Sequence, residues 1–197
     1  RLMSEYKICK RCIMDTTSDP NLILDENGVC NYCHDYDNIV KKMEYQKRQG
    51  TKYLETIFNK MKEEGKGKEY DCLLGISGGV DSSYLAYLAK QYGLRVLAVH
   101  VDAGWNSELA VQNIESMCSK LGYDLHTVVI DWPTMKELQR AYMFSGMAKV
   151  DVPQDHCFVA ATNQMIKKFH TKYVLRGDNY ATEGILSKAY QYTAGDW

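Results

Sequence analysis

The strongest constraint on the fold is a regular alternation of short apolar runs and amphipathic stretches downstream of Asp71. The apolar runs have the length of strands, and hydrophobic residues recur at helical spacing between them. Strands that are apolar throughout and alternate with helices are typical of a parallel sheet with right-handed crossovers. The sequence therefore predicts the α/β class, with a doubly wound, mainly parallel sheet. We expect strands at 71–76, 95–101, 125–130 and 173–176, and helices at 82–92, 107–121, after Pro133 and at about 156–170.

The loops after these strands are the expected binding region, because open parallel sheets bind ligands beyond the carboxyl ends of their strands. The first of these loops lies in 73-LLGISGGVDSS-83, which is rich in glycine and hydroxyl residues. Ser77 matches the centre of the G-x-S-x-G pattern of a nucleophile elbow, but spacing marks no histidine as its partner. The other two interpretations are a plain strand-to-helix turn and a cradle for phosphate.

The phosphate interpretation explains most residues of this loop. Gly78 and Gly79 allow successive backbone N–H groups to point inward, and the helix that follows adds the positive end of its dipole. The serines supply hydroxyl donors, and Asp81 can cap the helix or hold Mg²⁺ against phosphate. The lysine of a Walker loop is missing, which excludes an ordinary P-loop kinase or GTPase. We therefore predict that Ser77 is a phosphate ligand rather than a nucleophile.

The run 77-SGGVDS-82 resembles the S-G-G-x-D-S loop of the PP-loop ATP pyrophosphatases. The turns 100-HVDAGW-105 and 177-GDN-179, after the second and fourth predicted strands, are also similar to that family. The resemblance implies an adenine nucleotide alpha hydrolase-like fold and cleavage of ATP between the α and β phosphates. It implies that the nucleotide is bound by Ser77, Gly78, Gly79, Val80, Asp81, Ser82, Ser83, Asp102, Gly177 and Asn179.

Four of the seven cysteines form two C-x-x-C pairs near the N-terminus. Two such pairs at this spacing fit a closed site of four thiolates, and structural Zn²⁺ is the metal that we expect, with an iron–sulfur cluster or disulfides as the alternatives. The segment between the pairs has few large apolar residues, so the metal would supply its folding free energy. The other cysteines, Cys72, Cys118 and Cys157, lie in or beside apolar segments and are expected to be buried. The predicted metal ligands are Cys9, Cys12, Cys30 and Cys33.

The chain divides into three predicted parts. Residues 5–37 form a small zinc-ribbon-like module, and 38–68 form a helical linker that breaks near Gly50. Residues 69–197 form the PP-loop domain. Because the resemblance implies that family members continue further, part of this domain is expected beyond Trp197.

The stretch 8-ICKRCIMDTTSDPNLILDENGVCNYC-33 closely resembles the opening of the N-acetyl sugar amidotransferases, and the similarity continues to 177-GDNYATEGIL-186. These enzymes act in bacterial surface-polysaccharide (lipopolysaccharide) and nonulosonic acid biosynthesis. The resemblance implies that ATP, with Mg²⁺, adenylates the acetamido oxygen of a sugar that is linked to a nucleotide, and that ammonia replaces this oxygen to give an acetamidino group. A separate glutaminase is the expected source of ammonia, because the chain shows no glutaminase nucleophile with a matched histidine.

Several polar residues at the strand ends are candidates for catalysis. Asp102 is assigned to Mg²⁺ or the nucleotide, although a solvated loop carboxylate accounts for it equally simply. Asp178 and Asn179 are assigned to nucleotide or sugar, with a turn after the strand as the alternative. Trp105 and Tyr180 could stack on a base or a sugar, or serve only in packing. The residues assigned to catalysis are Asp81, Ser82, Asp178 and Glu183.

Composition bears on the rival functions. A PP-loop enzyme that modifies tRNA, by thiolation or in the manner of a lysidine synthase, would combine a zinc-binding N-terminus with the same loop. Such an enzyme needs a basic surface, whereas the formal net charge here is −1, so nucleic acid is an unlikely partner. A zinc-ribbon adaptor with a degenerate nucleotide fold is the third alternative. The sequence shows neither the apolar core of a signal peptide nor a membrane span, which favours the cytoplasm, where thiols stay reduced.

Overall fold

The computed structural model describes residues 6–48, 50–147 and 149–187 of the 197-residue chain. The chain forms two compact units. One unit consists of Arg1–Gly50 and Asn179–Thr193, and the other consists of Thr51–Asp178 and Ala194–Trp197. We call the first the cysteine unit and the second the sheet unit, and each is described by itself.

The sheet unit is built on a parallel sheet of four strands in the order β3-β2-β1-β4. Its strands are β1 (Cys72–Gly75), β2 (Val96–Asp102), β3 (Asp124–Val129) and β4 (Val174–Leu175). The register pairs Leu73 with Leu97 on one side and with Val174 on the other. The order reverses between β1 and β4, which makes the carboxyl ends of these two strands the expected ligand site. The α/β class and the parallel sheet that the sequence predicts are therefore confirmed.

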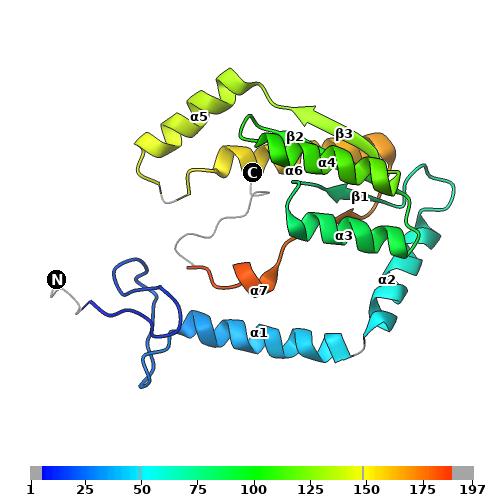
Figure 1. The fold of residues 1–197 in the computed structure, drawn as a ribbon. Helices are drawn as coiled ribbons and strands as arrows, with labels where there is room; N and C mark the ends of the chain where they lie inside the picture. The colour runs from blue at the N-terminus through cyan, green and yellow to red at the C-terminus, as the bar shows by residue number, and fades with distance from the viewer. Residues whose placement is uncertain (1–5, 49, 148, 188–197) are drawn as a thin grey trace. The chain divides into compact units, whose positions relative to one another are not determined.

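Helices cover both faces of this sheet (Figure 1). The crossovers from β1 to β3 use α3 (Val80–Gln91) and α4 (Glu108–Leu121), which lie on one face. The longer connection from β3 to β4 contains α5 (Trp132–Phe144) and α6 (Val152–Phe169), and α6 lies on the opposite face. The predicted strands and helices agree with these bounds to within a few residues, apart from the earlier starts of α3 and α6.

The alternation of side chains along β1 divides the core into two layers. Cys72 and Leu74 point into the layer shared with α3 and α4, together with Ala86 and Ile114. Leu73 points to the other layer, where the core includes Leu97, Val99 and Met165. A strand buried on both faces must be apolar at every position, which explains the uninterrupted run that predicted it.

The polar connector before β1 is fixed by an ion pair. The carboxylate of Asp71, which is 3% exposed, accepts hydrogen bonds from the backbone and guanidinium of Arg95. The same guanidinium donates to the carbonyl oxygens of Lys68 and Gly65 at 2.5 and 2.8 Å. The pair therefore ties the connector to the start of β2. The helix α2 (Thr51–Glu64) precedes this connector and contributes buried side chains to the core of the sheet unit.

The cysteine unit begins with a loop-rich segment that contains two isolated bridges, Ile8 with Asp15 and Leu24 with Cys30. This segment runs into α1 (Asn31–Arg48), and the short helix α7 (Tyr180–Glu183) belongs to the same unit. The helix predicted from residue 38 therefore starts earlier, at Asn31, and ends as predicted before Gly50.

The predicted domain boundaries at 5–37, 38–68 and 69–197 remain a prediction, and residue 5 and residues 188–197 lie outside the described residues. The two compact units are defined by packing, and they place α2 with the sheet. None of the helices in the described part of the chain is both long enough and apolar enough to cross a membrane.

Candidate functional site

The loop between β1 and α3 takes a conformation that requires glycine. Gly78 has φ of +76°, in the left-handed region. A Cβ atom at Gly78 would lie 2.5 Å from the carbonyl oxygen of Ala110 in α4, so a side chain is excluded by space as well as by φ. The Gly78 carbonyl oxygen accepts a hydrogen bond of 3.2 Å from the side-chain amide of Asn113. The first turns of α4 thus hold the loop in place.

The N-terminus of α3 is built differently from those of its neighbours. Ser107 caps α4 by accepting from the amide of Ala110, and Asp131 caps α5 by accepting from that of Thr134. The corresponding residue of α3 is Gly79, which has no side chain to accept from the first amides. Such a terminus suits an anionic ligand, because backbone N–H groups and the helix dipole both favour negative charge there.

The predicted assignment of Asp81 changes in one respect. Since α3 begins at Val80, Asp81 lies in its first turn and Gly79 occupies the cap. Asp81 therefore does not cap the helix, while Mg²⁺ binding and orientation of the loop stay predictions for its carboxylate.

The three serine hydroxyls of the loop form hydrogen bonds within it. The Ser77 and Ser82 hydroxyl oxygens lie 3.3 Å apart, and the Ser83 hydroxyl donates to the Gly79 carbonyl oxygen at 2.7 Å. The Ser82 hydroxyl also reaches the Gly79 carbonyl oxygen, at 3.2 Å. The structure therefore brings Ser82 and Ser83 to one loop carbonyl, with the Ser77 hydroxyl beside Ser82. Because hydroxyl groups rotate freely, each of them can donate to an oxyanion from this position.

The end of β4 packs against the first turn of α3. A Cβ atom at Gly177 would lie 2.8 Å from the Ser82 nitrogen and 3.0 Å from its Cα. This contact joins the segments that follow β1 and β4, at the point where the strand order reverses. Asp178, next in the chain, forms an exposed ion pair with Arg176, with 3.1 Å between Nε and Oδ2.

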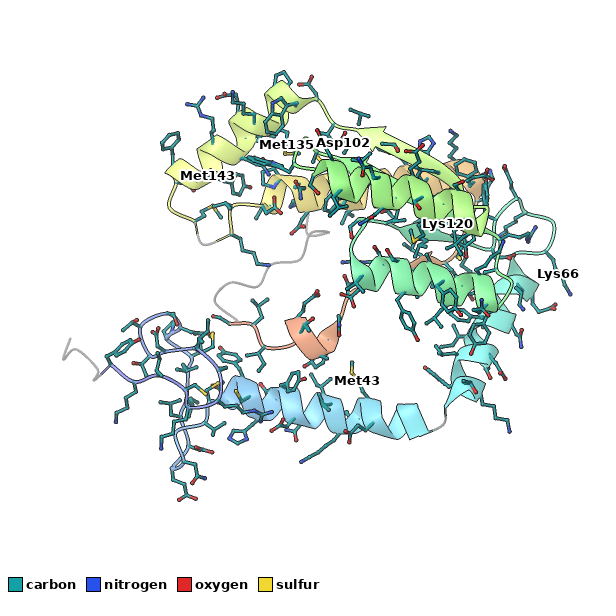
Figure 2. All side chains as sticks on the ribbon, viewed as in Figure 1. Met43, Lys66, Asp102, Lys120, Met135 and Met143 are labelled. Carbon is teal, nitrogen blue, oxygen red and sulfur yellow. The ribbon has the colours of Figure 1, made fainter. Side chains whose placement is uncertain are left out.

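Asp102, at the carboxyl end of β2 (Figure 2), organises the turn that follows it. Its Oδ1 accepts from the Gly104 backbone amide and from the Asn106 side-chain amide, both at 2.9 Å. The same Asn106 amide lies 3.1 Å from His100 Nε2, and His100 Nδ1 lies 3.0 Å from the Ile76 carbonyl oxygen. A carbonyl oxygen only accepts, so Nδ1 is the donor and Nε2 the acceptor.

His100 was not singled out by the sequence prediction, although it links the turn after β2 to the residue just before the glycine loop. It is 7% exposed. The available signal was a single histidine inside the apolar run 95–101, where a buried polar group needs partners.

Two tryptophans flank the same turn. Trp105 and Trp132 meet edge to face with ring centroids 5.3 Å apart, and Trp132 covers Gly104 so closely that a Cβ there would lie 2.3 Å from the indole. Trp105 Nε1 donates to Gln139 Oε1 at 2.6 Å, and Gln139 in turn donates to Asp151 at 3.0 Å. Trp105 remains 60% exposed, so its ring offers a face near the end of β2.

The remaining predicted site residues, Asn179 and Glu183, belong to the cysteine unit. The Asn179 side chain caps α7 by accepting from the Ala181 amide at 3.1 Å. Glu183 lies in the first turn of this four-residue helix, and Tyr180 stacks on Tyr36 of α1.

The four predicted metal ligands meet in space. The Sγ atoms of Cys9, Cys12, Cys30 and Cys33 all lie within 4.8 Å of one another. Individual separations are 3.9 Å for Cys9–Cys33 and 3.6 Å for both Cys12–Cys30 and Cys30–Cys33. A tetrahedral ion with Zn–S bonds of about 2.3 Å separates its sulfur ligands by about 3.8 Å. The cluster is therefore compatible with a zinc ion.

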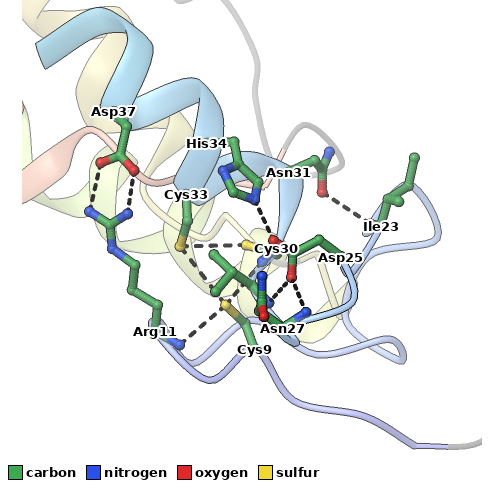
Figure 3. A network of polar contacts seen from close by, with 11 residues as sticks. Cys9, Arg11, Ile23, Asp25, Asn27, Cys30, Asn31, Cys33, His34 and Asp37 are labelled. Carbon is green, nitrogen blue, oxygen red and sulfur yellow. Dashed lines mark hydrogen bonds and ion pairs between the residues drawn. The ribbon is translucent and has the colours of Figure 1, made fainter. Parts of the chain in front are cut away.

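Hydrogen bonds around Cys9 favour the thiolate form of this residue (Figure 3). Cys9 Sγ accepts from the backbone amides of Arg11 and Cys30 at 3.4 and 3.3 Å. Burial favours the neutral thiol, but hydrogen bonds from backbone amides, those of Cys12 and Arg11 foremost, outweigh it and lower the pKa of Cys9 to about 6. At Cys33 burial prevails and raises the pKa of that thiol.

Two polar side-chain pairs lie beside the cluster (Figure 3). Arg11 forms a bidentate pair with Asp37 of α1, at 2.5 and 2.7 Å. His34 Nε2 lies 3.0 Å from Asp25 Oδ2, so the histidine next to Cys33 is engaged by a carboxylate. The group of possible metal ligands in the described residues accordingly consists of the four cysteines.

The other cysteines carry no mark of reactivity. Cys72 and Cys118 are buried and Cys157 is partly buried. Burial raises the pKa of all three thiols, that of Cys72 to about 12. A reactive cysteine needs a lowered pKa and access to solvent, so these three behave as structural residues.

Comparison with known proteins agrees with this geometry. The family model described as "Queuosine biosynthesis protein QueC" matches residues 71–178. This range begins just before β1 and ends just after β4, so it contains the glycine loop and every strand of the sheet.

Two groups of relatives act on tRNA according to their names. The tRNA(Ile)-lysidine synthase of Chlamydia pneumoniae is 38% identical over 90 residues, which cover 40% of this chain and 28% of that protein. The tRNA-specific 2-thiouridylase MnmA of Pseudoalteromonas translucida is 40% identical over 65 residues, which cover 28% of this chain and 17% of that protein. The matched region thus spans under a third of either relative.

Solved structures share the fold at lower identity. The NMN synthetase of Francisella tularensis superimposes with a TM-score of 0.50 and 20% identity, covering 70% of this chain and 59% of that one. The glutamine-dependent NAD+ synthetase of Acinetobacter baumannii, in complex with ADP, gives a TM-score of 0.50 and 22% identity, covering 64% of this chain and 25% of that one. At this identity the likeness concerns the fold alone.

Proposed function

Because the chain belongs to the QueC family of PP-loop ATP pyrophosphatases, we propose that it cleaves ATP to AMP and pyrophosphate in order to adenylate a substrate oxygen. The observation that carries this proposal is the glycine-built loop after β1. Gly78 lies against Ala110, Gly177 lies against Ser82, and the N-terminus of α3 lacks a side-chain cap. These features provide a compact backbone cradle for phosphate.

The loop residues receive roles from their positions. Ser77, Ser82 and Ser83 donate their hydroxyls, and the amides around Gly79 and Val80 donate their N–H groups, to the departing pyrophosphate. Donors aimed at oxygens that gain charge in the transition state lower the barrier to P–O cleavage.

Carboxylates at two strand ends would hold Mg²⁺. Asp81 lies in the first turn of α3, and Asp102 uses Oδ1 to fix its own turn, so Oδ2 is the oxygen that we assign to the metal. When bound, Mg²⁺ neutralises charge on the phosphates. The exposed face of Trp105 provides a stacking surface near the same end of the sheet, and Gly177 allows the close approach of β4.

We propose that the substrate is an N-acetyl sugar linked to a nucleotide. Support comes from residues 8–33, which lie outside the region matched by the family model and resemble the opening of the N-acetyl sugar amidotransferases. The structure adds that their four cysteines meet at distances that suit one metal ion. Asp178, Asn179 and Glu183 are proposed to contact this substrate.

The proposed reaction has two steps. The acetamido oxygen attacks the α-phosphorus of ATP, the bond to the β-phosphate oxygen breaks, and loss of the amide proton leaves an O-adenylyl imidate and pyrophosphate. Ammonia then adds to the imidate carbon, and the C–O bond breaks to release AMP, which carries the original amide oxygen. The product is an acetamidino group, which is protonated and therefore carries a positive charge. Most of the catalysis is positioning and charge stabilisation by the loop.

Three further assignments belong to this proposal. The cysteine cluster holds a structural Zn²⁺, because four thiolates leave no open position for catalysis. A separate glutaminase supplies the ammonia. The protein works in the cytoplasm, where reduced cysteines persist as metal ligands.

Modification of tRNA is the second candidate function, and the named relatives favour it. Two observations weigh against it. The formal net charge is −1, which gives little general attraction to a polyanion. Thiolation also calls for an activated cysteine, whereas burial raises the pKa of Cys72, Cys118 and Cys157.

A single incubation tests these functions. The protein is given ATP, ammonium and either a nucleotide-linked acetamido sugar or unmodified tRNA, and nucleotides and products are analysed by mass spectrometry. We expect AMP, pyrophosphate and a sugar lighter by the mass difference between O and NH. ADP and phosphate would refute the pyrophosphatase. Modified tRNA with an unchanged sugar would refute the amidotransferase and establish the second candidate.

A further inference from the structure

The segment that follows β4 returns to the N-terminal part of the chain. Asn179–Ser187 belongs to the same compact unit as residues 6–37, which contain the four cysteines and which we call the cysteine module. Segments so distant in sequence stay together only if specific contacts hold them, because bringing them together costs chain entropy. The structure provides three such contacts.

The first contact is a buried carboxylate. Asp19 is 1% exposed, and its Oδ2 accepts from the Ser187 hydroxyl at 2.5 Å. The same carboxylate accepts from the Tyr32 hydroxyl at 2.5 Å and from the Asn21 amide at 2.7 Å. A buried charge of this kind is costly unless its hydrogen bonds are complete, so Ser187 is an integral part of the module's interior.

The second contact is aromatic. The rings of Tyr36 in α1 and Tyr180 in α7 stack with centroids 5.6 Å apart and an interplanar angle of 7°. The Tyr36 hydroxyl also donates to the Ala181 carbonyl oxygen at 3.3 Å. A four-residue helix has little stability of its own, so α7 depends on this packing.

The third contact leads to the sulfur cluster. Ile185 packs against the buried group that contains Cys9, Cys30 and Cys33. Tyr32, which donates to Asp19, lies between Cys30 and Cys33 in the first turn of α1. The geometry that a metal ion imposes on this knuckle therefore also sets the position of Tyr32, and through Asp19 that of Ser187.

We propose that the cysteine module anchors Asn179–Ser187, and that the metal at the four cysteines determines whether this segment is ordered. The inference rests on the metal site of the proposed function. The metal would then order a segment of the proposed substrate site in addition to stabilising the module. This segment follows Gly177 and Asp178 directly in the chain, and it carries Asn179 and Glu183.

Hydrogen–deuterium exchange of the whole protein tests the inference without any substrate. The amides of 179–187 are followed with zinc bound and after a chelator has removed it, and metal content is measured in parallel. We expect at least tenfold faster exchange in 179–187 after zinc removal, with unchanged exchange in β1 and β2. Unchanged protection of 179–187 in the metal-free protein would overturn the proposal. Equal loss throughout β1 and β2 would also overturn it, because the effect would then be global.

Variants separate the anchor from the metal. Ser187→Ala and Tyr36→Ala should each raise exchange in 179–187 about tenfold while zinc content stays at the wild-type value. Tyr36→Phe keeps the stacked ring and should restore most of the protection that Tyr36→Ala loses. Ser119→Ala, on the exposed side of α4, is the control and should change nothing. Wild-type exchange in both anchor variants would refute the proposal, whether or not the protein turns over ATP.

Discussion

Gly177 and Ser82 lie in backbone contact, so close that a Cβ atom on Gly177 would sit 2.8 Å from the Ser82 nitrogen. The contact joins the end of β4 to the first turn of α3, where the strand order reverses. Because the atoms of Ser82 that it would meet are backbone atoms, they cannot move aside as the end of a flexible side chain can.

Gly177→Ala should displace the end of β4 or the first turn of α3. We expect a loss of about 1–3 kcal/mol in the free energy of unfolding and a fall of at least tenfold in the rate of AMP and pyrophosphate release. The matched control is Gly75→Ala in β1, where the nearest atom to an added Cβ is 4.0 Å away. Equal activity losses in the two variants would contradict the assignment.

Gly78→Ala tests the glycine loop against a control with nearly the same backbone strain. Gly67 has φ of +78° and Gly78 has +76°, but an added Cβ meets nothing within 4 Å at Gly67 and lies 2.5 Å from the Ala110 oxygen at Gly78. Both variants bear the cost of a left-handed alanine, about 1 kcal/mol. Only Gly78→Ala should lose ATP binding, measured by calorimetry. Loss of ATP binding in Gly67→Ala as well would show that backbone strain, and not the clash with Ala110, abolishes binding.

Ser82→Ala removes the hydroxyl that bonds the Gly79 carbonyl oxygen and that we propose donates to pyrophosphate. The rate constant for AMP release should fall about 10²-fold, the usual effect of removing one donor to a developing oxyanion. The melting temperature should stay near the wild-type value. The substitution Thr162→Ala also removes one hydroxyl, here one that donates to the Phe158 carbonyl oxygen in α6. This control should leave the rate unchanged, and a wild-type rate in Ser82→Ala would rule out the donor role.

Cys12→Ser should lower the bound zinc well below one ion per chain, because removal of one thiolate opens a closed four-ligand site. Elemental analysis gives the stoichiometry, and the spectrum of the cobalt-substituted protein reports tetrahedral thiolate ligands. Cys157→Ser, which alters a cysteine outside the cluster, should retain the full metal content. If the purified protein contained iron and sulfide instead of zinc, the site would be assigned to an iron–sulfur cluster.

Acid should weaken the cysteine unit partly through Asp19. Burial favours its neutral form, but hydrogen bonds from Ser187 and Tyr32 outweigh burial and lower its pKa from 3.8 to about 2. A lowered pKa means that the carboxylate stabilises the fold above pH 3.8 and that this contribution disappears as the pH falls toward 2. Urea melts of Asp19→Asn should show a weaker pH dependence than wild type in that window. Identical slopes would refute the assignment.

Much of the sheet unit could be predicted because its rules are local. Strands buried on both faces must be apolar, and the pair Gly78-Gly79 marks a loop whose backbone conformation requires glycine. The sequence also predicted that the four cysteines lie close together, since two C-x-x-C pairs can bind one metal ion.

The parts that were missed depend on contacts between distant segments. No local pattern announces that Gly177 reaches Ser82, because this depends on the strand order. No local pattern predicts the hydrogen bond between His100 and the Ile76 carbonyl oxygen either. The hydrogen bond from the Ser187 hydroxyl to Asp19 is equally invisible in the local sequence. The early start of α1 at Asn31 also lacked a signal, since residues 31–37 interrupt the apolar periodicity that marked the rest of the helix.

The bond from Asn113 to the Gly78 carbonyl oxygen has a consequence for the orientation of the next peptide N–H group. A peptide group is a rigid dipole whose oxygen and N–H point in opposite directions. By drawing the oxygen toward α4, Asn113 turns the N–H of the same peptide group, that of Gly79, to the other side. One side chain on a neighbouring helix thereby helps to set the direction of this N–H group, whose nitrogen lies 3.4 Å from the Ser77 hydroxyl oxygen.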